Sequence, residues 1–293
     1  MSIQTVAVVG SGFMGSGIAQ VCAQSGFPVC LVDIDEQRLA HAQKSIRWSV
    51  EKLVSKGVVA DAVDEVLGRV STARHLEAAA EADLAIEAVY EQIALKQEVF
   101  AQLHHLCKAE AILASNTSTI PIAKLAQATK RPDRVIGMHF FGPVPLMRLL
   151  EITPNPRTDE AVTQSIVDFA YAVGKNPILV RQDIPGFLMN RIFGAMACEA
   201  IRLVERGAGS IEEIDQGMCD GFNMRVGPLC IADLAGLDIS LNAFNVMHGL
   251  DPEYLPKAPA LLERLVREGH LGAKSGQGFY IWDENGKRRG PAF

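Results

Sequence analysis

Residues Thr5–Gly15 read TVAVVGSGFMG, a short apolar run that passes directly into a glycine-rich turn. The run Thr5–Val9 has the length and composition of a strand that is buried on both faces of a parallel sheet. Three glycines follow at the spacing GxGxxG. Gly10 suits a tight turn, Gly12 lets the backbone approach a pyrophosphate, and Gly15 lets the next helix pack closely on the strand.

The residues after this turn extend the same pattern. A helix is expected at Ser16–Ser25, where its free N–H groups would face a phosphate. The next apolar run, Pro28–Val32, ends in Asp33. A carboxylate there can hydrogen-bond both hydroxyls of an adenosine ribose and would repel a 2′-phosphate. We therefore predict a site for NAD rather than NADP; the alternative is a turn that serves another nucleotide or none.

Apolar runs alternate with helical stretches over most of the chain's first two thirds. The runs with strand character are Val70–Thr72, Ala82–Glu87, Ala111–Ala114, Arg134–Met138 and Pro177–Val180. This alternation predicts an α/β, Rossmann-like, doubly wound and mostly parallel sheet in a domain spanning 1–183. An all-helical domain is predicted over 184–293, with a short extended tail. Its expected segments are Phe187–Glu205, Ser210–Cys219, Ile231–Met247, Ala260–Glu268 and the tail Gly278–Trp282.

The segment 35–67 is long for a connection between two strands. Its apolar residues recur at helical spacing, and Gly57 predicts a break into a hairpin of two helices that projects from the domain. Arg47, Lys52 and Lys56 could form a basic patch for a phosphorylated ligand. A solvated helix face is the alternative, and these residues alone favour it.

A second candidate site lies in Val135–Glu151, VIGMHFFGPVPLMRLLE. Here His139 lies at the end of one apolar strand, and Glu151 lies at the end of a second apolar run. Imidazole exchanges protons near neutral pH, and a carboxylate on its far nitrogen would hold its tautomer. The pattern suggests a proton-transfer pair. The alternative is a histidine at a strand edge and a glutamate that faces solvent.

Other polar residues follow the ends of predicted strands. Glu91 comes just after one strand, at the edge where ligands bind in such sheets, and Lys96 falls on the next helix. The run Ser115–Thr119, SNTST, can face the site or cap a helix that begins near Ile120, and both can hold if one hydroxyl caps while another faces the site.

Composition restricts the class of protein. With 293 residues and a net charge of −6, the chain is not expected to bind nucleic acid. Its six cysteines lack metal-ligand spacing, which favours reduced thiols in a cytoplasmic protein without a metal site. We expect neither a signal peptide nor a membrane span. The apolar surplus of the helical region predicts a homodimer formed through it.

Together these segments resemble the L-3-hydroxyacyl-CoA dehydrogenase family, of the short, monofunctional 3-hydroxybutyryl-CoA dehydrogenase type. The similarity runs almost from end to end. The motifs that carry it are VAVVGSGFMGSGIAQ, LVDID, IEAVYEQIALK, ASNTSTIPI, GMHFFGPVPLMRLLEI, DIPGFLMNRI, AIRLVERGAGSIEEIDQGM, VGPLCIADLAGLD and GAKSGQGFY.

The resemblance implies NAD-dependent, reversible oxidation of a short-chain (S)-3-hydroxyacyl-CoA to the 3-ketoacyl-CoA, a reaction of fatty acid β-oxidation. It implies His139 as general base or acid, oriented by Glu151. Ser118 and Asn190 would contact the 3-oxygen. The implied cofactor residues are Gly10, Gly12, Phe13, Met14, Gly15, Asp33, Glu91, Lys96, Ser118 and Lys274. The implied coenzyme A residues are Ser49, Lys56 and Ser118. Because two of them lie on the predicted hairpin, the resemblance favours a ligand-binding hairpin over a solvated helix face.

Two positions depart from the family pattern. Gly142 stands where the family usually has Asn after His-Phe-Phe, and Gln92 stands where it usually has Asn after Glu. Both bear on acyl preference. Two other functions remain open: a dehydrogenase of a free hydroxy acid, and a non-catalytic NAD-binding protein on the same fold.

Overall fold

The computed structural model describes residues 3–293, and these divide into two compact units. The first unit ends at Phe187 and the second begins at Leu188. The predicted boundary, after residue 183, lies a little ahead of this division.

The first unit is built on one sheet, which contains eight strands of the described chain in the order β3-β2-β1-β4-β5-β6-β7-β8. The strands are β1 Val6–Val9, β2 Val29–Val32, β3 Val70–Ala73, β4 Leu84–Glu87, β5 Ile112–Ser115, β6 Val135–Phe140, β7 Leu149–Pro154 and β8 Asn176–Leu179. The first six pair in parallel, whereas β7 runs antiparallel to β6 and parallel to β8. The predicted α/β, mostly parallel sheet is confirmed.

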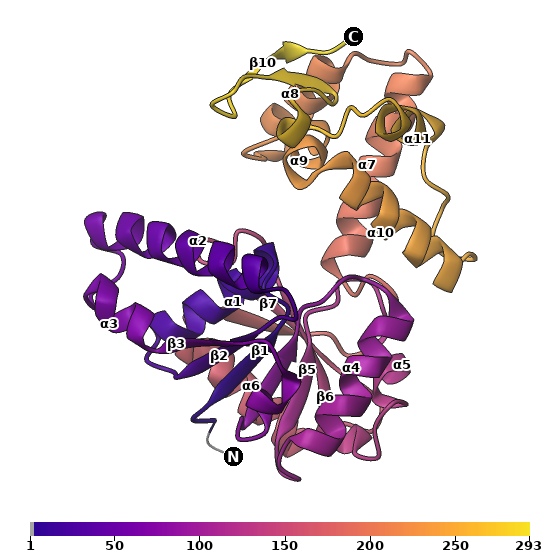
Figure 1. Ribbon diagram of the computed structural model, residues 1–293. Helices are drawn as coiled ribbons and strands as arrows, with labels where there is room; N and C mark the ends of the chain where they lie inside the picture. The colour runs from indigo at the N-terminus through magenta and orange to yellow at the C-terminus, as the bar shows by residue number, and fades with distance from the viewer. Residues whose placement is uncertain (1–2) are drawn as a thin grey trace. The chain divides into compact units, whose positions relative to one another are not determined.

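Helices connect these strands and cover the sheet (Figure 1). They are α1 Phe13–Gln24, α2 Glu36–Ser55, α3 Val63–Gly68, α4 Ile93–Leu106, α5 Ile122–Ala126 and α6 Glu160–Ala172, with short 3₁₀ turns at Leu76–Ala79 and Pro132–Arg134. The first helix begins at Phe13 and not at the predicted Ser16, because Gly12 already has the extended backbone of an N-cap. The second and third glycines of the motif therefore bracket the start of α1.

Two helices, α2 and α3, occupy the segment for which a hairpin is predicted. In Figure 1, α2 and α3 lie side by side at the margin of the first unit, away from most of the strands. Asp35 caps α2 by accepting hydrogen bonds from two backbone N–H groups. Gly57, with φ +67°, follows the end of α2 and lets the chain turn back.

The second unit is mainly helical, as predicted. Its helices are α7 Met189–Glu205, α8 Ile211–Phe222, α9 Pro228–Ala235, α10 Leu237–Leu250 and α11 Ala260–Arg267, with a 3₁₀ turn at Ala273–Ser275. The single helix expected over Ile231–Met247 is wrong. The chain breaks at Gly236, whose φ is +98°, and the axes of α9 and α10 differ by 97°. Glycine permits this backbone, which other residues rarely adopt.

The extended tail is also corrected, because it is half of a β-hairpin. Strand β9, Tyr280–Trp282, pairs antiparallel with β10, Arg288–Pro291. The buried carboxylate of Asp233 accepts hydrogen bonds from the backbone N–H groups of Phe279 and Tyr280 and from the indole of Trp282. These donors stabilise the charged carboxylate and lower the pKa of Asp233, but burial has the larger effect and raises it. The second unit is thus not purely helical.

No single helix within residues 3–293 is both long and apolar enough to cross a membrane. The helices α9 and α10 meet those criteria of length and composition only when they are taken together as a bent pair.

Candidate active site

The glycine-rich turn is crowded on one side and open on the other. A Cβ on Gly10, whose φ is +102°, would lie 2.6 Å from the carbonyl oxygen of Ala88, and one on Gly15 would lie 1.8 Å from the oxygen of Gly10. At Gly12, by contrast, no described heavy atom outside residues 11–13 lies within 4 Å of the position of a Cβ. Gly12 is also the N-cap of α1, without a side-chain cap in the described chain. The turn therefore offers open backbone and N–H groups to a phosphate.

The carboxylate of Asp33, which follows the end of β2, holds this turn in place by hydrogen bonds. Its Oδ2 accepts hydrogen bonds from the backbone N–H and the hydroxyl of Ser11, both at 2.8 Å, and its Oδ1 accepts one from the N–H of Asp35 at 3.1 Å. Phe13 and Met14 form the first turn of α1, and Phe13 is 68% exposed. The turn, the helix N-terminus and the carboxylate together fit a dinucleotide.

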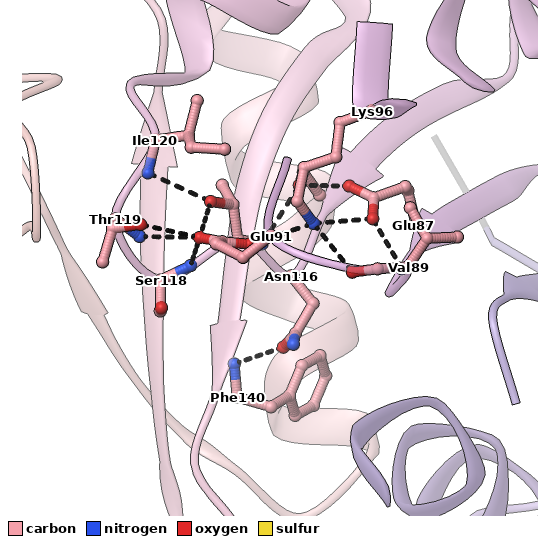
Figure 2. A network of polar contacts seen from close by, with 11 residues as sticks. Glu87, Val89, Glu91, Lys96, Asn116, Ser118, Thr119, Ile120 and Phe140 are labelled. Carbon is pink, nitrogen blue, oxygen red and sulfur yellow. Dashed lines mark hydrogen bonds and ion pairs between the residues drawn. The ribbon is translucent and has the colours of Figure 1, made fainter. Parts of the chain in front are cut away.

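A buried ion cluster lies beside the ends of β4 and β5 (Figure 2). Lys96, on α4, is only 1% exposed, and its ammonium lies 2.7 Å from Oε1 of Glu87 and 3.1 Å from Oε2 of Glu91. It also donates a hydrogen bond to the carbonyl of Val89 at 3.2 Å. The hydroxyl of Ser115 donates to Glu87 at 2.6 Å. Lys96 is thus fully engaged with protein partners, and its contact with the cofactor stays a prediction.

The charges of this cluster are stabilised unequally. Burial opposes the charge on Lys96, but its two carboxylates outweigh burial and raise its pKa. Burial likewise opposes the charge on Glu91, yet Lys96 and two hydroxyls lower its pKa. At Glu87, burial outweighs Lys96 and raises the pKa. Both carboxylates share the ammonium of Lys96, but Glu91 accepts more hydrogen bonds than Glu87. The additional donors account for the difference between the two pKa shifts.

Glu91 also holds the polar run Ser115–Thr119 in place. Its Oε1 accepts hydrogen bonds from the N–H of Ser118 at 3.0 Å and from the N–H and hydroxyl of Thr119 at 3.1 and 2.9 Å. The hydroxyl of Thr117 donates to the same oxygen at 2.5 Å. In Figure 2 the hydroxyl of Ser118 points away from Glu91. The backbone of Ser118 is therefore fixed while its side chain faces elsewhere.

The predicted helix cap in this run is wrong. Helix α5 begins at Ile122 and not near Ile120, and its N-cap residue supplies no side-chain cap. The carboxylate of Asp183 takes that role, because it accepts hydrogen bonds from the N–H groups of Ile122 and Ala123 at 2.7 and 2.6 Å. An acid sixty residues away in the sequence gives no local sign of this function.

His139 and Glu151 face one another across β6 and β7. The two residues are direct partners in the antiparallel register, which explains how a spacing of twelve brings them together. The Nδ1 of His139 lies 2.7 Å from Oε2 of Glu151. Glu151 is completely buried, and His139 is 6% exposed. Aromatic rings enclose the imidazole, with the ring centroids of Phe141 and Phe187 at 4.4 and 6.0 Å.

This geometry assigns the two nitrogens of His139 different tasks. A carboxylate at Nδ1 favours a proton there, so that Nε2 becomes the nitrogen that can exchange a proton with another molecule. The buried carboxylate would also stabilise an imidazolium. The end of β6 is tied to the neighbouring loop as well, because the Oδ1 of Asn116 accepts a hydrogen bond from the N–H of Phe140 at 2.9 Å (Figure 2).

The remaining predicted residues lie at α2 and in the second unit. Ser49, on α2, accepts a hydrogen bond from Gln20 at 2.9 Å, and Lys56 is exposed at the end of that helix. In the second unit, Asn190 lines a cavity of about 140 Å³. Lys274 in that unit donates a hydrogen bond to Asp238 at 2.7 Å.

Three residues that help to hold the site together have no role predicted from the sequence. They are Glu87, Asn116 and Asp183. Glu87 had the clearest signal, since a carboxylate that closes a wholly buried strand needs a cationic partner. Asn116 was noticed only as one of several small polar residues, because nothing local tells which partner an amide takes.

Both parts of the chain match models of one protein family. Residues 5–184 match the NAD binding domain of 3-hydroxyacyl-CoA dehydrogenase, and residues 186–282 match its C-terminal domain. A Deinococcus radiodurans protein named probable 3-hydroxybutyryl-CoA dehydrogenase is 44% identical over 93% of this chain and 98% of its own. A Bacillus subtilis protein of the same name is 42% identical over 97% of this chain and 99% of its own.

Solved structures give the same result. Mycobacterium tuberculosis FadB2 superimposes with a TM-score of 0.93 at 40% identity, covering 97% of this chain and 100% of its own. The (S)-3-hydroxybutyryl-CoA dehydrogenase PaaH1 of Ralstonia eutropha superimposes with a TM-score of 0.89 at 38% identity, with the same coverage of 97% and 100%.

Proposed function

The chain belongs to the 3-hydroxyacyl-CoA dehydrogenase family and is an NAD-dependent dehydrogenase, and from this we propose that it interconverts (S)-3-hydroxyacyl-CoA and 3-ketoacyl-CoA. Short acyl chains, such as 3-hydroxybutyryl-CoA, are the proposed substrates. The observation that carries the proposal is the buried pair of His139 and Glu151 at the end of β6. This strand is parallel to the one that leads into the glycine-rich turn, so both features lie at the carboxyl edge of the sheet.

In the proposed reaction, the chain moves a proton and orients the substrate. Nε2 of His139 takes the proton of the 3-hydroxyl group during oxidation and returns it during reduction. Glu151 holds the imidazole and stabilises its charged form. Ser118 and Asn190 contact the 3-oxygen. NAD, when bound, supplies the acceptor for the hydride from C3.

We assign the coenzyme A moiety to α2. Lys56, the C-cap of this helix, is exposed, and Ser49 on the helix is half-buried. On the same helix, the indole of Trp48 is 58% exposed, and the ammonium of Lys52 lies 3.8 Å from the centre of its ring. Ammonium groups and an aromatic face suit a ligand that combines phosphates with a base.

Removing the charge of Lys56 should weaken the binding of the coenzyme A moiety alone. For Lys56→Ala, we expect the KM for acetoacetyl-CoA to rise roughly tenfold, the effect of losing one hydrogen bond to a charged group. The KM for the N-acetylcysteamine thioester, which lacks the nucleotide, should not change. Lys130→Ala removes another exposed lysine as a matched control. Equal effects of Lys56→Ala on both thioesters would contradict the assignment to α2.

The proposed reaction is tested by following NADH consumption with acetoacetyl-CoA, longer 3-ketoacyl-CoAs and free acetoacetate in parallel. We expect the highest kcat/KM with acetoacetyl-CoA and little turnover of the free acid. Equal turnover of free acetoacetate would favour the dehydrogenase of a free hydroxy acid. Binding of NADH without turnover of any of them would favour the non-catalytic alternative.

We further propose a cytoplasmic homodimer that takes part in β-oxidation. The second unit supports the dimer with its exposed apolar side chains. They are Ile192, Phe222, Leu234, Ile239 and Tyr254, each more than half exposed. Light scattering on the purified protein tests the dimer, since a monomeric mass would contradict it.

A further inference from the structure

Gly142 lies in the loop that joins β6 to β7, the strands of His139 and Glu151. A Cβ at this position would lie 2.5 Å from Cε1 and 3.2 Å from Cζ of Phe13, and 3.4 Å from the sulfur of Met14. Real Cβ atoms do not approach a ring carbon so closely, because the two would overlap. The loop thus rests directly on the first turn of α1, and the Phe13 ring fills the space that a side chain at position 142 would need.

Two other contacts hold this loop in place. Val144 is buried, and a Cβ on Gly17 of α1 would lie 2.9 Å from the Cβ of Val144, which shows how closely loop and helix pack. From the other side, the buried ammonium of Lys175 donates hydrogen bonds to the carbonyls of Val144 and Met147, the latter at 2.8 Å. An ammonium buried against carbonyls resists separation from them.

The Phe13 ring, in contrast, is 68% exposed and can rotate. A side chain added at position 142 would therefore displace the ring and leave the loop where it is. The displaced ring has open space near Gly12, where no described heavy atom outside residues 11–13 lies within 4 Å of the Cβ position. That space is the part of the turn assigned to the pyrophosphate.

We propose that Phe13 and Gly142 are a complementary pair in which the absence of a side chain at position 142 keeps the Phe13 ring out of the dinucleotide site. Phe13 is thus a positioning residue at the junction of the cofactor turn and the loop between His139 and Glu151. The pair gives a structural reason for a glycine at position 142 of this chain. The proposal adds to the proposed function, but rests only on its NAD site.

The test is a double-mutant cycle on NADH affinity, measured by the fluorescence of the bound nucleotide. Gly142→Asn alone should raise the Kd for NADH roughly threefold to tenfold, as expected when a ring leaves its preferred rotamer. In the Phe13→Ala background the same substitution should change Kd by less than about twofold, since no ring remains to be displaced. Gly68→Ala serves as control, because no described heavy atom lies within 4 Å of its Cβ position once its chain neighbours and the backbone of its own helix are left out.

Two results would overturn the proposal. One is an equal rise in Kd when Gly142→Asn is made with and without Phe13→Ala. The other is an unchanged Kd in Gly142→Asn alone. If Gly142→Asn does not fold, refolding in the Phe13→Ala background supports the pair, and failure in both backgrounds contradicts it. NADH binding needs no substrate, so the cycle remains decisive even if no acyl-CoA is turned over.

Discussion

Replacing His139 by glutamine is expected to lower kcat by at least about 100-fold, because a positioned proton acceptor contributes about 10²–10⁴-fold to the rate of such a step. Glutamine has a similar size and can occupy the pocket between the two phenylalanine rings, but it cannot exchange the proton. The measurement is steady-state turnover of acetoacetyl-CoA and NADH, together with the Kd for NADH. That Kd should stay at the wild-type value, since Gly10, Gly12 and Gly15 are unchanged.

The companion variant tests how the imidazole is held. Glu151→Gln should also lose turnover with little change in NADH affinity, because the amide keeps the shape of the side chain but not its charge. His105→Gln, at an exposed position on α4, is the matched control and should leave kcat unchanged. Near wild-type turnover in His139→Gln would remove His139 from the mechanism. A loss of NADH affinity without a loss of turnover in Glu151→Gln would move Glu151 to the cofactor site.

Replacing Lys96 by methionine should destabilise the protein by about 3–5 kcal/mol, the cost of leaving buried carboxylates without their cation. Glu87 is completely buried and would lose a partner at 2.7 Å, and Glu91 would lose one at 3.1 Å. The free energy of unfolding, from denaturant titration, measures the effect. Lys130→Met, which removes an exposed lysine, should change stability by no more than about 0.5 kcal/mol.

The pH dependence and a second substitution test the cause of this loss. Without Lys96, the buried carboxylates should have pKa values above those in the unfolded chain. The folded variant then binds more protons than the unfolded one, so its deficit should grow as pH rises and shrink as pH falls toward the ordinary carboxylate range. Adding Glu87→Gln to Lys96→Met should recover part of the stability. A deficit that is independent of pH would contradict an electrostatic origin.

The elements predicted from sequence are those with local causes. The run TVAVV followed by glycines indicates a buried strand and a turn whatever lies around it, because apolar length and backbone freedom are local properties. The break at Gly236 was missed because one glycine can also sit inside a helix. The strand Arg288–Pro291 was missed because its residues, RRGP, lack an apolar alternation and become a strand only by pairing with β9.

In the site, the sequence identified the types of residue but not the partners of each. A carboxylate twelve residues from His139 becomes its neighbour only because β7 returns antiparallel to β6. The resemblance assigned Glu91 and Lys96 to the cofactor, and the fold places both in a buried cluster that holds the Ser118 backbone. Neither distance nor burial can be read from residues that are far apart in the sequence.

The sequence by itself therefore determined the sheet, the dinucleotide turn and the family, since these depend on apolar runs, glycine spacing and motifs within short segments. Only the tertiary structure decided which nitrogen of His139 faces Glu151, what neutralises Lys96, and how closely Phe13 approaches position 142. Each of those depends on contacts between segments that meet only after folding. The Phe13 ring lies 2.5 Å from the position of a Cβ on Gly142, although the two residues are more than a hundred positions apart along the chain.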